Sequence, residues 1–403
     1  MIKYIITKNP ADCCGCRGCE QICSHHALTM YENEEGFLYP VLKEDACINC
    51  GLCEKVCPMT HGTTLLYNEG QTLAVQNLDK IDLFTSSSGG AFVAIAKKII
   101  EDSGVVYGAA FENGPTLCHQ RITTAEGLER LKGSKYLQSN IGDTYLQTKQ
   151  DLISGKKVYF VGTPCQVAGL RLFLRKNYEN LFVSDFVCHG TPSNKVFSNT
   201  INHIEKKIGG SFNNFSFRDK RIKGWSCSSS SSWRKGNREV SIIYSKDMEA
   251  YFNAFISGDL MRMSCYSCPF ARFERCGDIT LADYWGARLN SPNFPQLGKG
   301  VSLLIINSEK GQKYFENISH QFHIETISKD AASSSNDNLL KPSSLKPDRK
   351  FSYYLAMNDY KSFVDKYYKG NYFVNKLRVY LEYNIRRSPL LFNIFSFLKN
   401  KFV

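Results

Sequence analysis

Two short cysteine runs with the same spacing constrain this chain more than any other feature of its sequence. Both runs read C-x2-C-x2-C-x3-C and lie within residues 13–57. Three cysteines at two-residue gaps wrap a loop around one face of an iron-sulfur cube, and the fourth points toward the other cube. The spacing therefore predicts two 4Fe-4S clusters, one bound by Cys13, Cys16, Cys19 and Cys57 and the other by Cys47, Cys50, Cys53 and Cys23.

Structural zinc is the alternative for these runs, because C-x2-C knuckles also hold zinc. Four cysteines so closely spaced, twice over, fit cubes better than zinc. Pro58 completes the C-P signature of the second run, and Ser24 stands at that place in the first. A proline there only helps to end the ligand run, so its absence removes nothing essential. Cys14 is an extra thiol in the first loop and is interpreted as a bystander.

The sixteen cysteines of the chain would suggest disulfides in a secreted protein. The N-terminus, however, begins MIKYIITK and lacks the apolar segment and cleavage site of a signal peptide. The thiols are therefore expected to be ligands or buried side chains in a reducing cytosol, which predicts a cytoplasmic protein. No apolar run approaches the roughly 20 residues that a membrane span needs.

The formal charge of +12 is spread unevenly along the chain. Residues 1–60 carry five Lys or Arg and eight Asp or Glu, whereas residues 361–403 carry nine and two. A basic body joined to an acidic cluster module favours anionic cofactors and acidic redox partners on the body. Nucleic acid is the rival interpretation, but no recognisable nucleic-acid motif accompanies the charge, so no such partner is expected.

Composition shifts divide the chain into three parts. A polar link at residues 60–70 follows the cysteine runs and marks the end of a two-cluster module, residues 1–60. Residues 61–328 are expected to form one large catalytic domain, and residues 329–403 a polar crossing with a basic, aromatic tail. Within that tail, residues 390–398 are mostly apolar. Nine such residues cannot span a bilayer; packing on the protein's own body is preferred, and peripheral membrane or partner contact is the alternative.

Strand and helix patterns alternate in the large domain. Apolar runs predict strands, with helices starting near residues 91, 164 and 193, and the strands lie at residues 71–77, 105–111, 156–161 and 181–187. This alternation indicates helices on both faces of a sheet. The predicted fold is therefore an α+β ferredoxin-like module followed by an α/β domain with a mostly parallel sheet.

Two of the predicted turns carry chemistry. Residues 85–90, Thr-Ser-Ser-Ser-Gly-Gly, open a helix whose first-turn N–H groups suit a phosphate, and a plain capped helix start is the alternative. Residues 162–165 turn a strand into a helix, with Thr163 at the N-cap and Pro164 at the first helical position. Cys165 then lies at a helix N-terminus, where a thiolate is favoured.

Four of the remaining cysteines are predicted to hold a third metal group. Cys265 and Cys268 form a C-x2-C pair, which is half of a metal site. Neighbouring parallel strands end at one edge of a sheet, so Cys165 and Cys188 can supply the other half. Cys276 is a reserve ligand, since C-x2-C-x7-C also places three ligands on one segment. Structural zinc is a stronger alternative here, because this spacing is not diagnostic.

Several motifs in one order resemble the family of coenzyme F-420 hydrogenase/dehydrogenase beta subunits, in its bacterial form with a fused double-cluster ferredoxin. The resemblance covers about residues 10–310. Besides the two cysteine runs, the motifs are Ser87-Ser88-Gly89-Gly90, Lys132-Gly133-Ser134-Lys135-Tyr136 with Gln138-Ser139, Gly162-Thr163-Pro164-Cys165-Gln166, Cys188-His189-Gly190, Arg218-Asp219-Lys220, Cys265-Tyr266-Ser267-Cys268, Asp278-Ile279-Thr280 and Asp283-Tyr284-Trp285-Gly286.

The resemblance implies an FAD at the binding edge of the sheet and a third 4Fe-4S cluster beside it. The family pattern has no fixed cysteine at position 276, which favours Cys165 as the fourth ligand. Flavin contacts are expected at Ser87, Ser88, Gly89, Gly90, Lys135, Ser139, Gly162 and Thr163. The backbone of residues 88–90 is predicted to hold the pyrophosphate, aided by Lys135. No catalytic residue is assigned.

The expected function is that of an FAD-dependent iron-sulfur oxidoreductase. A flavin exchanges hydrides and single electrons, whereas each cluster carries one electron. The resemblance implies a small-molecule redox substrate, such as the deazaflavin coenzyme or a chlorophyll-type molecule, and a protein partner such as a ferredoxin or reductase. It also offers a link to polysaccharide biosynthesis. The alternatives are a non-catalytic electron-transfer subunit that passes electrons to a partner enzyme, and a zinc-stabilised binding module.

Overall fold

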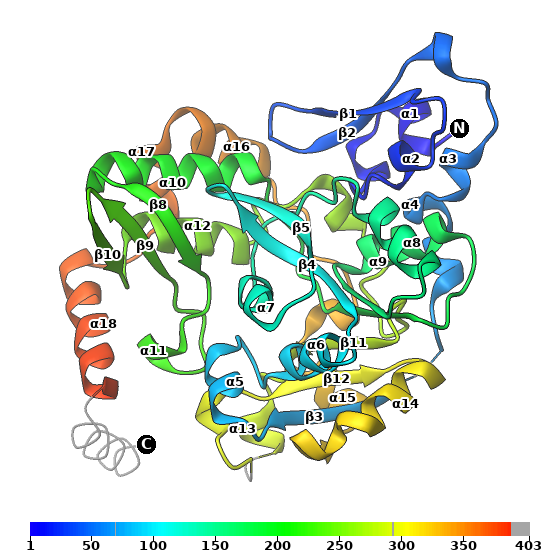
Figure 1. Cartoon of the computed structure of the whole chain (residues 1–403). Helices are drawn as coiled ribbons and strands as arrows, with labels where there is room; N and C mark the ends of the chain where they lie inside the picture. The colour runs from blue at the N-terminus through cyan, green and yellow to red at the C-terminus, as the bar shows by residue number, and fades with distance from the viewer. Residues whose placement is uncertain (69, 292–293, 388–403) are drawn as a thin grey trace.

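The computed structural model describes residues 1–68, 70–291 and 294–387. A small α+β module lies at the N-terminal end, at the top of Figure 1. Its antiparallel sheet pairs β1 (Leu28–Glu32) with β2 (Leu38–Leu42). The short helices α1 (Lys3–Thr7) and α2 (Gly18–Gln21) contact these strands, and α3 (Leu52–Lys55) contacts α2.

One mixed sheet of eight strands forms the centre of the large domain, in the order β13-β3-β12-β11-β7-β6-β4-β5. The strands are β3 (Gln71–Asn77), β4 (Val105–Glu112), β5 (Thr116–Ile122), β6 (Val158–Val161), β7 (Leu181–Phe186), β11 (Ile279–Asp283), β12 (Ser302–Ile306) and β13 (Phe322–Thr326). The strands β11, β7, β6 and β4 run parallel to one another. Every other neighbouring pair in the described sheet is antiparallel.

The prediction of a mostly parallel sheet is therefore wrong in its extent, since only the central strands are parallel. At one edge, β4 turns directly into β5 through Asn113 and Gly114, whose φ values are +46° and +111°. Asn-Gly with positive φ is a strong signal for a two-residue hairpin. At the other edge, β12 inserts between β3 and β11 and is antiparallel to both.

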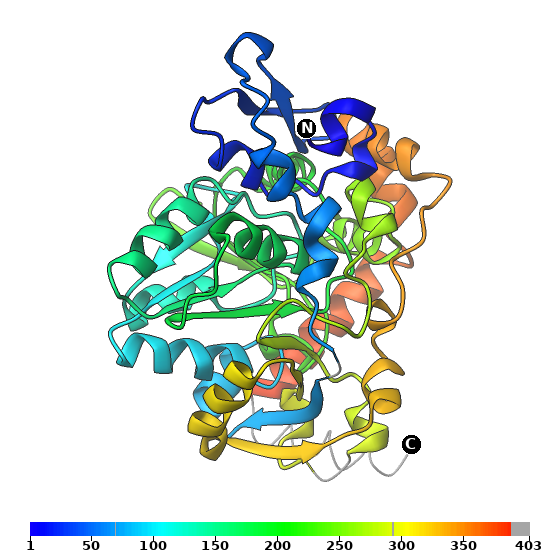
Figure 2. The same ribbon diagram turned by 90° about the vertical axis from the view of Figure 1, so that its right-hand side faces the viewer.

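Helices cover both faces of this sheet (Figures 1 and 2). On one face, α6 (Ala91–Glu101) and α14 (Glu309–Ile318) pack with the side chain of Tyr159. On the other face, α8 (Thr144–Ile153) and α9 (Pro164–Leu174) pack with Val158 and Phe160. Alternate side chains of β6 thus enter different cores, as the period of a strand buried on both faces requires.

A second layer joins a three-stranded antiparallel sheet to four helices. The sheet consists of β8 (Ser211–Ser216), β9 (Ser230–Lys235) and β10 (Arg238–Ile242), and the helices are α10 (Asn194–Ile208), α12 (Lys246–Ile256), α16 (Arg349–Asn358) and α17 (Tyr360–Tyr367). Tyr353, Phe363 and Tyr367 of the C-terminal part are buried in this core. The described part of the tail therefore packs on the body, whereas residues 390–398 lie outside the described residues.

Shorter helices connect these layers, and they are α4 (Pro58–His61), α5 (Lys80–Thr85), α7 (Ala125–Leu131), α11 (Lys220–Lys223), α13 (Ala287–Asn290) and α15 (Lys329–Ser333), with α18 (Tyr372–Arg387) as the last described helix. The N-terminal module is docked on the large domain through specific polar contacts. Arg349 of α16 forms two bonds of 2.7 and 2.6 Å to the carboxylate of Glu35, in the β1–β2 turn. Gln21 accepts hydrogen bonds from the backbone N–H groups of Tyr145 and Leu146 at the start of α8.

Candidate functional site

The two cysteine loops of the module repeat one backbone conformation. Positive φ occurs two residues after the first cysteine, with +71° at Gly15 and +54° at Asn49. It recurs directly after the second cysteine, with +60° at Arg17 and +72° at Gly51. Positive φ is uncommon outside glycine, so its repetition at matched places indicates the same loop built twice. In the first loop, the Gly15 N–H donates to the Cys13 sulfur at 3.4 Å.

The thiols of the two runs have the neighbours that the crossed assignment predicts. Burial raises the pKa of Cys19, and the nearby Cys13 and Cys57 add to this shift. Cys57 belongs to the second run in sequence, but its thiol lies with the first, as the predicted cluster requires. Burial likewise raises the pKa of Cys53, with Cys50 as a charged neighbour. Two loops that each present cysteine sulfurs in this way fit two 4Fe-4S clusters.

The large domain brings together the four cysteines predicted to hold a third cluster. One cavity is lined by Cys165, Cys188, Cys265 and Cys268. Cys165 is the second residue of α9, and Cys188 follows β7, so parallel strand ends deliver both as expected. The other two lie on the 3-10 turn Met263–Ser267 and directly after it. Burial raises the pKa of Cys188, and the other three thiols add to the shift in the order Cys265, Cys165 and Cys268.

Cys14 also lines this cavity, although its interpretation as a bystander gave it no place there. The loop that binds the first predicted cluster therefore faces the third predicted site directly. A Cβ atom on Gly169 of α9 would lie 3.2 Å from Cys16 Sγ, so a glycine allows α9 to approach this loop closely. Among the residues that the structure describes, no three His, Cys, Asp or Glu side chains are arranged to hold a single metal ion.

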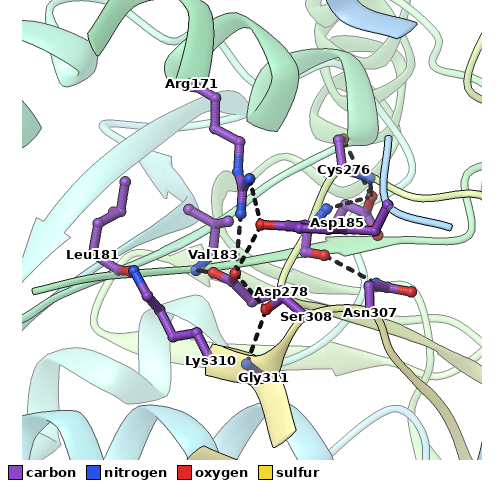
Figure 3. A network of polar contacts seen from close by, with 12 residues as sticks. Arg171, Leu181, Val183, Asp185, Cys276, Asp278, Asn307, Ser308, Lys310 and Gly311 are labelled. Carbon is purple, nitrogen blue, oxygen red and sulfur yellow. Dashed lines mark hydrogen bonds and ion pairs between the residues drawn. The ribbon is translucent and has the colours of Figure 1, made fainter. Parts of the chain in front are cut away.

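Cys276, the reserve ligand, belongs to a different network (Figure 3). Its thiol is fully buried and lies 3.2 Å from the carbonyl oxygen of Pro164 and 3.4 Å from Oδ2 of Asp185. Burial raises the pKa of the Cys276 thiol, and the Asp185 carboxylate adds to the shift. A protonated thiol that donates hydrogen bonds is a poor metal ligand. Cys276 is also absent from the residues that line the cavity.

The network around Cys276 positions the loops that carry two predicted ligands. Asp185 of β7 accepts a hydrogen bond from Thr280 of β11 and pairs with Arg275 at 3.4 Å. Asp278 accepts from the backbone N–H of Val183 at 2.9 Å and from Arg171 of α9 at 3.0 Å. These buried carboxylates tie β7, α9 and the strand after Cys276 together (Figure 3). The relative position of Cys165 and Cys188 therefore depends on them.

The serine-glycine turn at residues 87–90 lies at the carboxyl end of β3 and opens α6. The Gly89 N–H donates to Ser302 Oγ at 2.8 Å, and a Cβ there would lie 2.4 Å from the Val75 carbonyl oxygen. Gly89 is thus a close-packing position against the sheet, which differs from its predicted role as a phosphate donor. Gly90 has a φ of +83° and gives α6 no side-chain cap. The first turn of α6 is therefore left without a side-chain acceptor.

The other predicted flavin residues divide between two places. Lys135 donates to the carbonyl oxygens at the end of α7, those of Arg130, Leu131 and Lys132, at 2.8–3.0 Å. Its ammonium therefore caps a helix C-terminus, and the prediction that Lys135 assists the turn at residues 87–90 is not supported. Ser87 accepts a hydrogen bond from the Ser134 N–H at 2.8 Å.

Ser139, Gly162 and Thr163 lie near the cysteine cavity, not near the serine-glycine turn. Ser139 and Thr163 line that cavity. Thr163 forms the predicted N-cap of α9 together with Gln166, and its hydroxyl lies 3.2 Å from Cys165 Sγ. The Gly162 N–H donates to the Ser184 carbonyl oxygen at 3.2 Å, within the sheet edge.

A buried lysine that was quoted without a role lies against the serine-glycine turn. Lys220 Nζ donates to the carbonyl oxygens of Leu83 and Ser88, both at 2.6 Å. Among the described contacts it has no carboxylate partner. Burial lowers the pKa of Lys220 to about 7, and the Arg218 guanidinium lowers it further. A buried ammonium without a counter-charge, beside an uncapped helix start, suits an anionic group.

An aromatic and charged cluster flanks Lys220. Arg218 pairs with Asp283 at 3.0 Å and lies over the ring of Trp285, 4.7 Å from its centroid. Trp225 stacks on Trp285 with centroids 4.9 Å apart and donates to Asp283 at 2.7 Å. Two motifs that are far apart in the sequence, at residues 218–220 and 283–286, therefore meet beside the turn at residues 87–90. Their shared presence in one motif set was the available signal for this site.

The predicted polar crossing covers part of the cysteine edge. Ser343 donates to the His189 carbonyl oxygen at 2.7 Å, and Asn338 Oδ1 lies 3.1 Å from His189 Nδ1. Asn338 and Pro342 also line the cysteine cavity. Residues beyond the family motifs thus complete the wall of the candidate site, which local sequence patterns did not indicate.

The repeated cysteine loops and the sheet with four more cysteines at one edge define an iron-sulfur electron-transfer protein of the oxidoreductase class. Residues 155–332 match the family described as the C terminus of the coenzyme F420 hydrogenase/dehydrogenase beta subunit. Residues 12–60 match the 4Fe-4S dicluster domain. The chain belongs to the family of coenzyme F420 hydrogenase/dehydrogenase beta subunits, with a 4Fe-4S dicluster domain at its N-terminus, as the sequence predicted.

Two known proteins from Methanosarcina are similar to parts of the chain. The F subunit of the F(420)H(2) dehydrogenase of Methanosarcina mazei is 24% identical over 187 residues, which cover 42% of this chain and 51% of that protein. The chain thus matches about half the length of this curated relative. A chain of the F420-reducing [NiFe] hydrogenase complex from Methanosarcina barkeri superimposes with a TM-score of 0.42 and 15% identity, over 75% of this chain and 93% of that chain.

Membrane-spanning capacity was assessed for the helices in the described ranges. None of these helices combines the length and the apolar character that crossing a bilayer demands.

Proposed function

We propose that this protein is an FAD-dependent iron-sulfur oxidoreductase that relays electrons between a one-electron carrier and a small-molecule substrate. The observation that supports this most is the cavity lined by Cys165, Cys188, Cys265 and Cys268. It lies at the same sheet edge as the anion-suited turn and directly beside the docked cysteine module. Four thiolate donors in a buried site fit a third 4Fe-4S cluster.

The exposure of the cysteine loops suggests the order of the carriers. Cys50 is exposed, whereas Cys16 is buried against α9. An outside carrier therefore reaches the cluster of Cys47, Cys50, Cys53 and Cys23 first. The cluster of Cys13, Cys16, Cys19 and Cys57 comes next and faces the cavity of the third. This order gives an electron path from the surface to the sheet edge.

The flavin assignment rests on the contacts around residues 87–90. Lys220 and the first turn of α6 would hold the pyrophosphate, and the stacked Trp225 and Trp285 supply a flat apolar surface beside it. When bound, a flavin exchanges a hydride with a substrate and single electrons with clusters. Strands β3 and β7 are separated by β12 and β11, which places their ends about 14 Å apart.

The same contacts also allow a second function, that of a subunit which only hands electrons to a partner enzyme. The curated relative is by name a dehydrogenase subunit, and coenzyme F420 is accordingly the first substrate to test. Oxidation or reduction of F420 by the purified chain alone would support the enzyme, and turnover only after addition of a partner would support the subunit. The link to polysaccharide biosynthesis stays a prediction.

An absorption spectrum of protein purified without oxygen tests the cofactors. We expect broad cluster absorbance near 400 nm with a flavin band near 450 nm, and about twelve iron atoms per chain. A colourless protein that contains zinc would refute the proposal.

Substitution of a single cysteine in each N-terminal loop should remove one cluster. Cys16→Ser and Cys50→Ser are each expected to lower the iron content by about four atoms. Flavin content should stay nearly unchanged, because the proposed flavin residues lie in the other domain. Cys14→Ser is the matched control, since it removes a thiol from the same loop without removing a ligand. Equal loss of flavin in both ligand variants would contradict the division between the two sites.

The last described helix supports a proposal about the membrane partner. One face of α18 packs on the body through Val379, Tyr380 and Tyr383. The opposite face exposes a stripe of apolar side chains, Phe373, Val374, Leu377 and Leu381. Basic residues flank this stripe, and they are Lys376, Arg378 and Arg387. An apolar stripe between cations complements an anionic lipid surface, so we propose that α18 lies on such a membrane.

Vesicle co-sedimentation tests this contact. Wild-type protein should sediment with vesicles that contain phosphatidylglycerol and should remain in the supernatant with pure phosphatidylcholine. Phe373→Ser with Leu377→Ser should reduce the bound fraction about tenfold, because two exposed apolar anchors are lost. Ile153→Ser, an exposed apolar position on α8, is the control. Unchanged lipid binding of the double variant, or self-association abolished by it, would contradict the lipid assignment.

A further inference from the structure

One buried arginine lies between the first cysteine loop and the four-cysteine cavity. Arg262 is 1% exposed, and it lines the cavity. Its Nε donates to the Cys13 carbonyl oxygen at 2.7 Å, and its Nη2 lies 3.5 Å from the Cys13 sulfur. The same Nη2 donates to the Leu38 carbonyl oxygen at 2.8 Å. The guanidinium therefore contacts a sulfur that is predicted to bind iron.

The partners of Arg262 leave its charge uncompensated. Within residues 1–68, 70–291 and 294–387, the hydrogen bonds of Arg262 go to carbonyl oxygens, to the amide oxygen of Gln138 and to the Cys13 sulfur, but to no carboxylate. The other strongly buried arginines each pair with a carboxylate, namely Arg171 with Asp278, Arg218 with Asp283, Arg275 with Asp185 and Arg349 with Glu35. A buried charge without an opposite charge is strongly unfavourable.

The surroundings of Arg262 fix the guanidinium in place. It lies over the ring of Tyr39, 4.1 Å from the centroid. Gln138 accepts from its Nη1 at 3.2 Å and donates to the Cys14 carbonyl oxygen at 2.8 Å. A Cβ atom on Gly15 would lie 2.8 Å from Nη1, so a glycine with positive φ keeps this space open. The loop and the arginine are thus fitted to each other.

We propose that Arg262 is the counter-charge of the cluster bound by Cys13, Cys16, Cys19 and Cys57, and that it raises the reduction potential of this cluster. The proposal rests on the proposed function, because it requires the clusters to be present. A cluster with four thiolates carries net negative charge, and reduction adds one more electron. A fixed cation at the sulfur stabilises the reduced state more than the oxidised state, because the attraction grows with the negative charge.

The consequence is a directed electron path. The cation lies on the side of the inner cluster that faces the third site, whereas the outer loop with Cys50 is exposed to solvent. Arg262 therefore makes the inner cluster the easier of the two to reduce. Electrons that enter at the outer cluster are drawn toward the sheet edge. Arg262 acts through the cluster and is a positioning residue in this sense.

Redox titration of the full chain, followed by electron paramagnetic resonance, tests this role. In Arg262→Gln we expect the one-electron equilibrium of the inner cluster to shift about tenfold toward the oxidised state, which is a fall of about 59 mV in midpoint potential. The iron content should stay that of the wild type. Arg262→Lys keeps the positive charge, and its potential should stay within about 20 mV of wild type, a factor of about two.

Arg349→Gln is the matched control. This arginine is also buried and also binds the N-terminal module, through Glu35, but none of its hydrogen bonds goes to a cysteine. Its substitution should weaken docking and leave the cluster potential unchanged. An equal fall in Arg349→Gln and Arg262→Gln would show that docking sets the potential, which overturns the proposal.

Three further outcomes are decisive. An unchanged potential in Arg262→Gln overturns the role of the arginine. If Arg262→Gln loses iron, the lysine variant decides, since iron loss or a lowered potential in Arg262→Lys as well would show that the charge is not the cause. Wild-type protein without cluster signals would refute the proposed function itself, whereas intact wild-type clusters with an unmoved potential refute only the role of Arg262.

Discussion

Replacing Cys188 by alanine is expected to remove about four of about twelve iron atoms and to leave both N-terminal clusters intact. Cys188 lines the buried cavity with three other thiols. A 4Fe-4S cluster that loses one of four thiolates in a buried apolar site has no water-exposed replacement ligand. Iron and acid-labile sulfide per chain measure the loss. Flavin reduction by an external one-electron donor should slow strongly, because the last relay before the flavin is missing.

Cys276→Ala is the matched control for this loss. Cys276 is a buried cysteine of the same domain, but its thiol bonds to Pro164 and Asp185. Its removal should leave the iron content unchanged and lower the free energy of unfolding by about 1–3 kcal/mol, because a buried carboxylate loses a donor. If Cys276→Ala removed iron while Cys165→Ala retained it, the ligand set would be wrong and Cys165 would become a candidate reactive thiol.

Local signals in the sequence predicted several elements with accurate bounds. The strand at residues 71–77 and the helix at residues 91–101 occur as β3 (Gln71–Asn77) and α6 (Ala91–Glu101). The helix that starts at Pro164 ends at Leu174, also as expected. Apolar periodicity, an N-cap threonine and a first-turn proline are all encoded within a few residues. The placement of Cys165 and Cys188 at one edge followed from the same local order of strands.

Strand neighbours were predicted less well, because pairing depends on residues far apart in the chain. β12 lies between β3 and β11, although some 225 residues separate it from β3. No local pattern specifies such an insertion. The antiparallel edge at β5 was different, since Asn113-Gly114 is a local hairpin signal that the sequence did contain.

Roles of single polar side chains were the least predictable part. Lys135 is close in sequence to a family motif, but its ammonium caps α7. Lys220 reaches the serine-glycine turn from 132 residues away. Arg262 reaches Cys13 over a separation of 249 residues. Such contacts follow from the packing of whole layers, and the sequence can only supply the candidates.

Lys220→Met should therefore lower the affinity for FAD about 10- to 100-fold, because a charge-assisted contact to the pyrophosphate is lost. Methionine keeps most of the apolar stem, so the fold around Leu83 and Ser88 is expected to persist. Lys135→Met is the matched control, since Lys135 also donates only to main-chain carbonyl oxygens in the described structure. Its affinity should stay within about threefold of wild type. Fluorescence titration of flavin-free protein with FAD measures both variants.

The two lysine variants also separate the sequence-based assignment from the structural one. Loss of FAD in Lys135→Met with retention in Lys220→Met would restore the original prediction. Gly89→Val is a poor test of flavin binding, because its side chain would collide with the backbone of Val75 and Ser302 and disturb the sheet itself. Retention of the N-terminal clusters in each lysine variant shows that the chain has folded.

The affinity of the wild-type protein for FAD should fall as the pH rises through about 7, because burial, and then Arg218, lowers the pKa of Lys220 to about 7. Above this pH the flavin-free protein loses the proton that the pyrophosphate requires, so Kd should rise by up to about tenfold per pH unit. Stability of the flavin-free chain has the opposite sign. An unfolded lysine keeps its proton to about pH 10, so the unfolded state binds more protons between about pH 7 and 10, and the contribution of Lys220 to stability increases with pH there. Lys220→Met should abolish the pH dependence of FAD binding. A flat wild-type profile with weak binding in Lys220→Met at every pH would instead mean that Lys220 acts through packing alone.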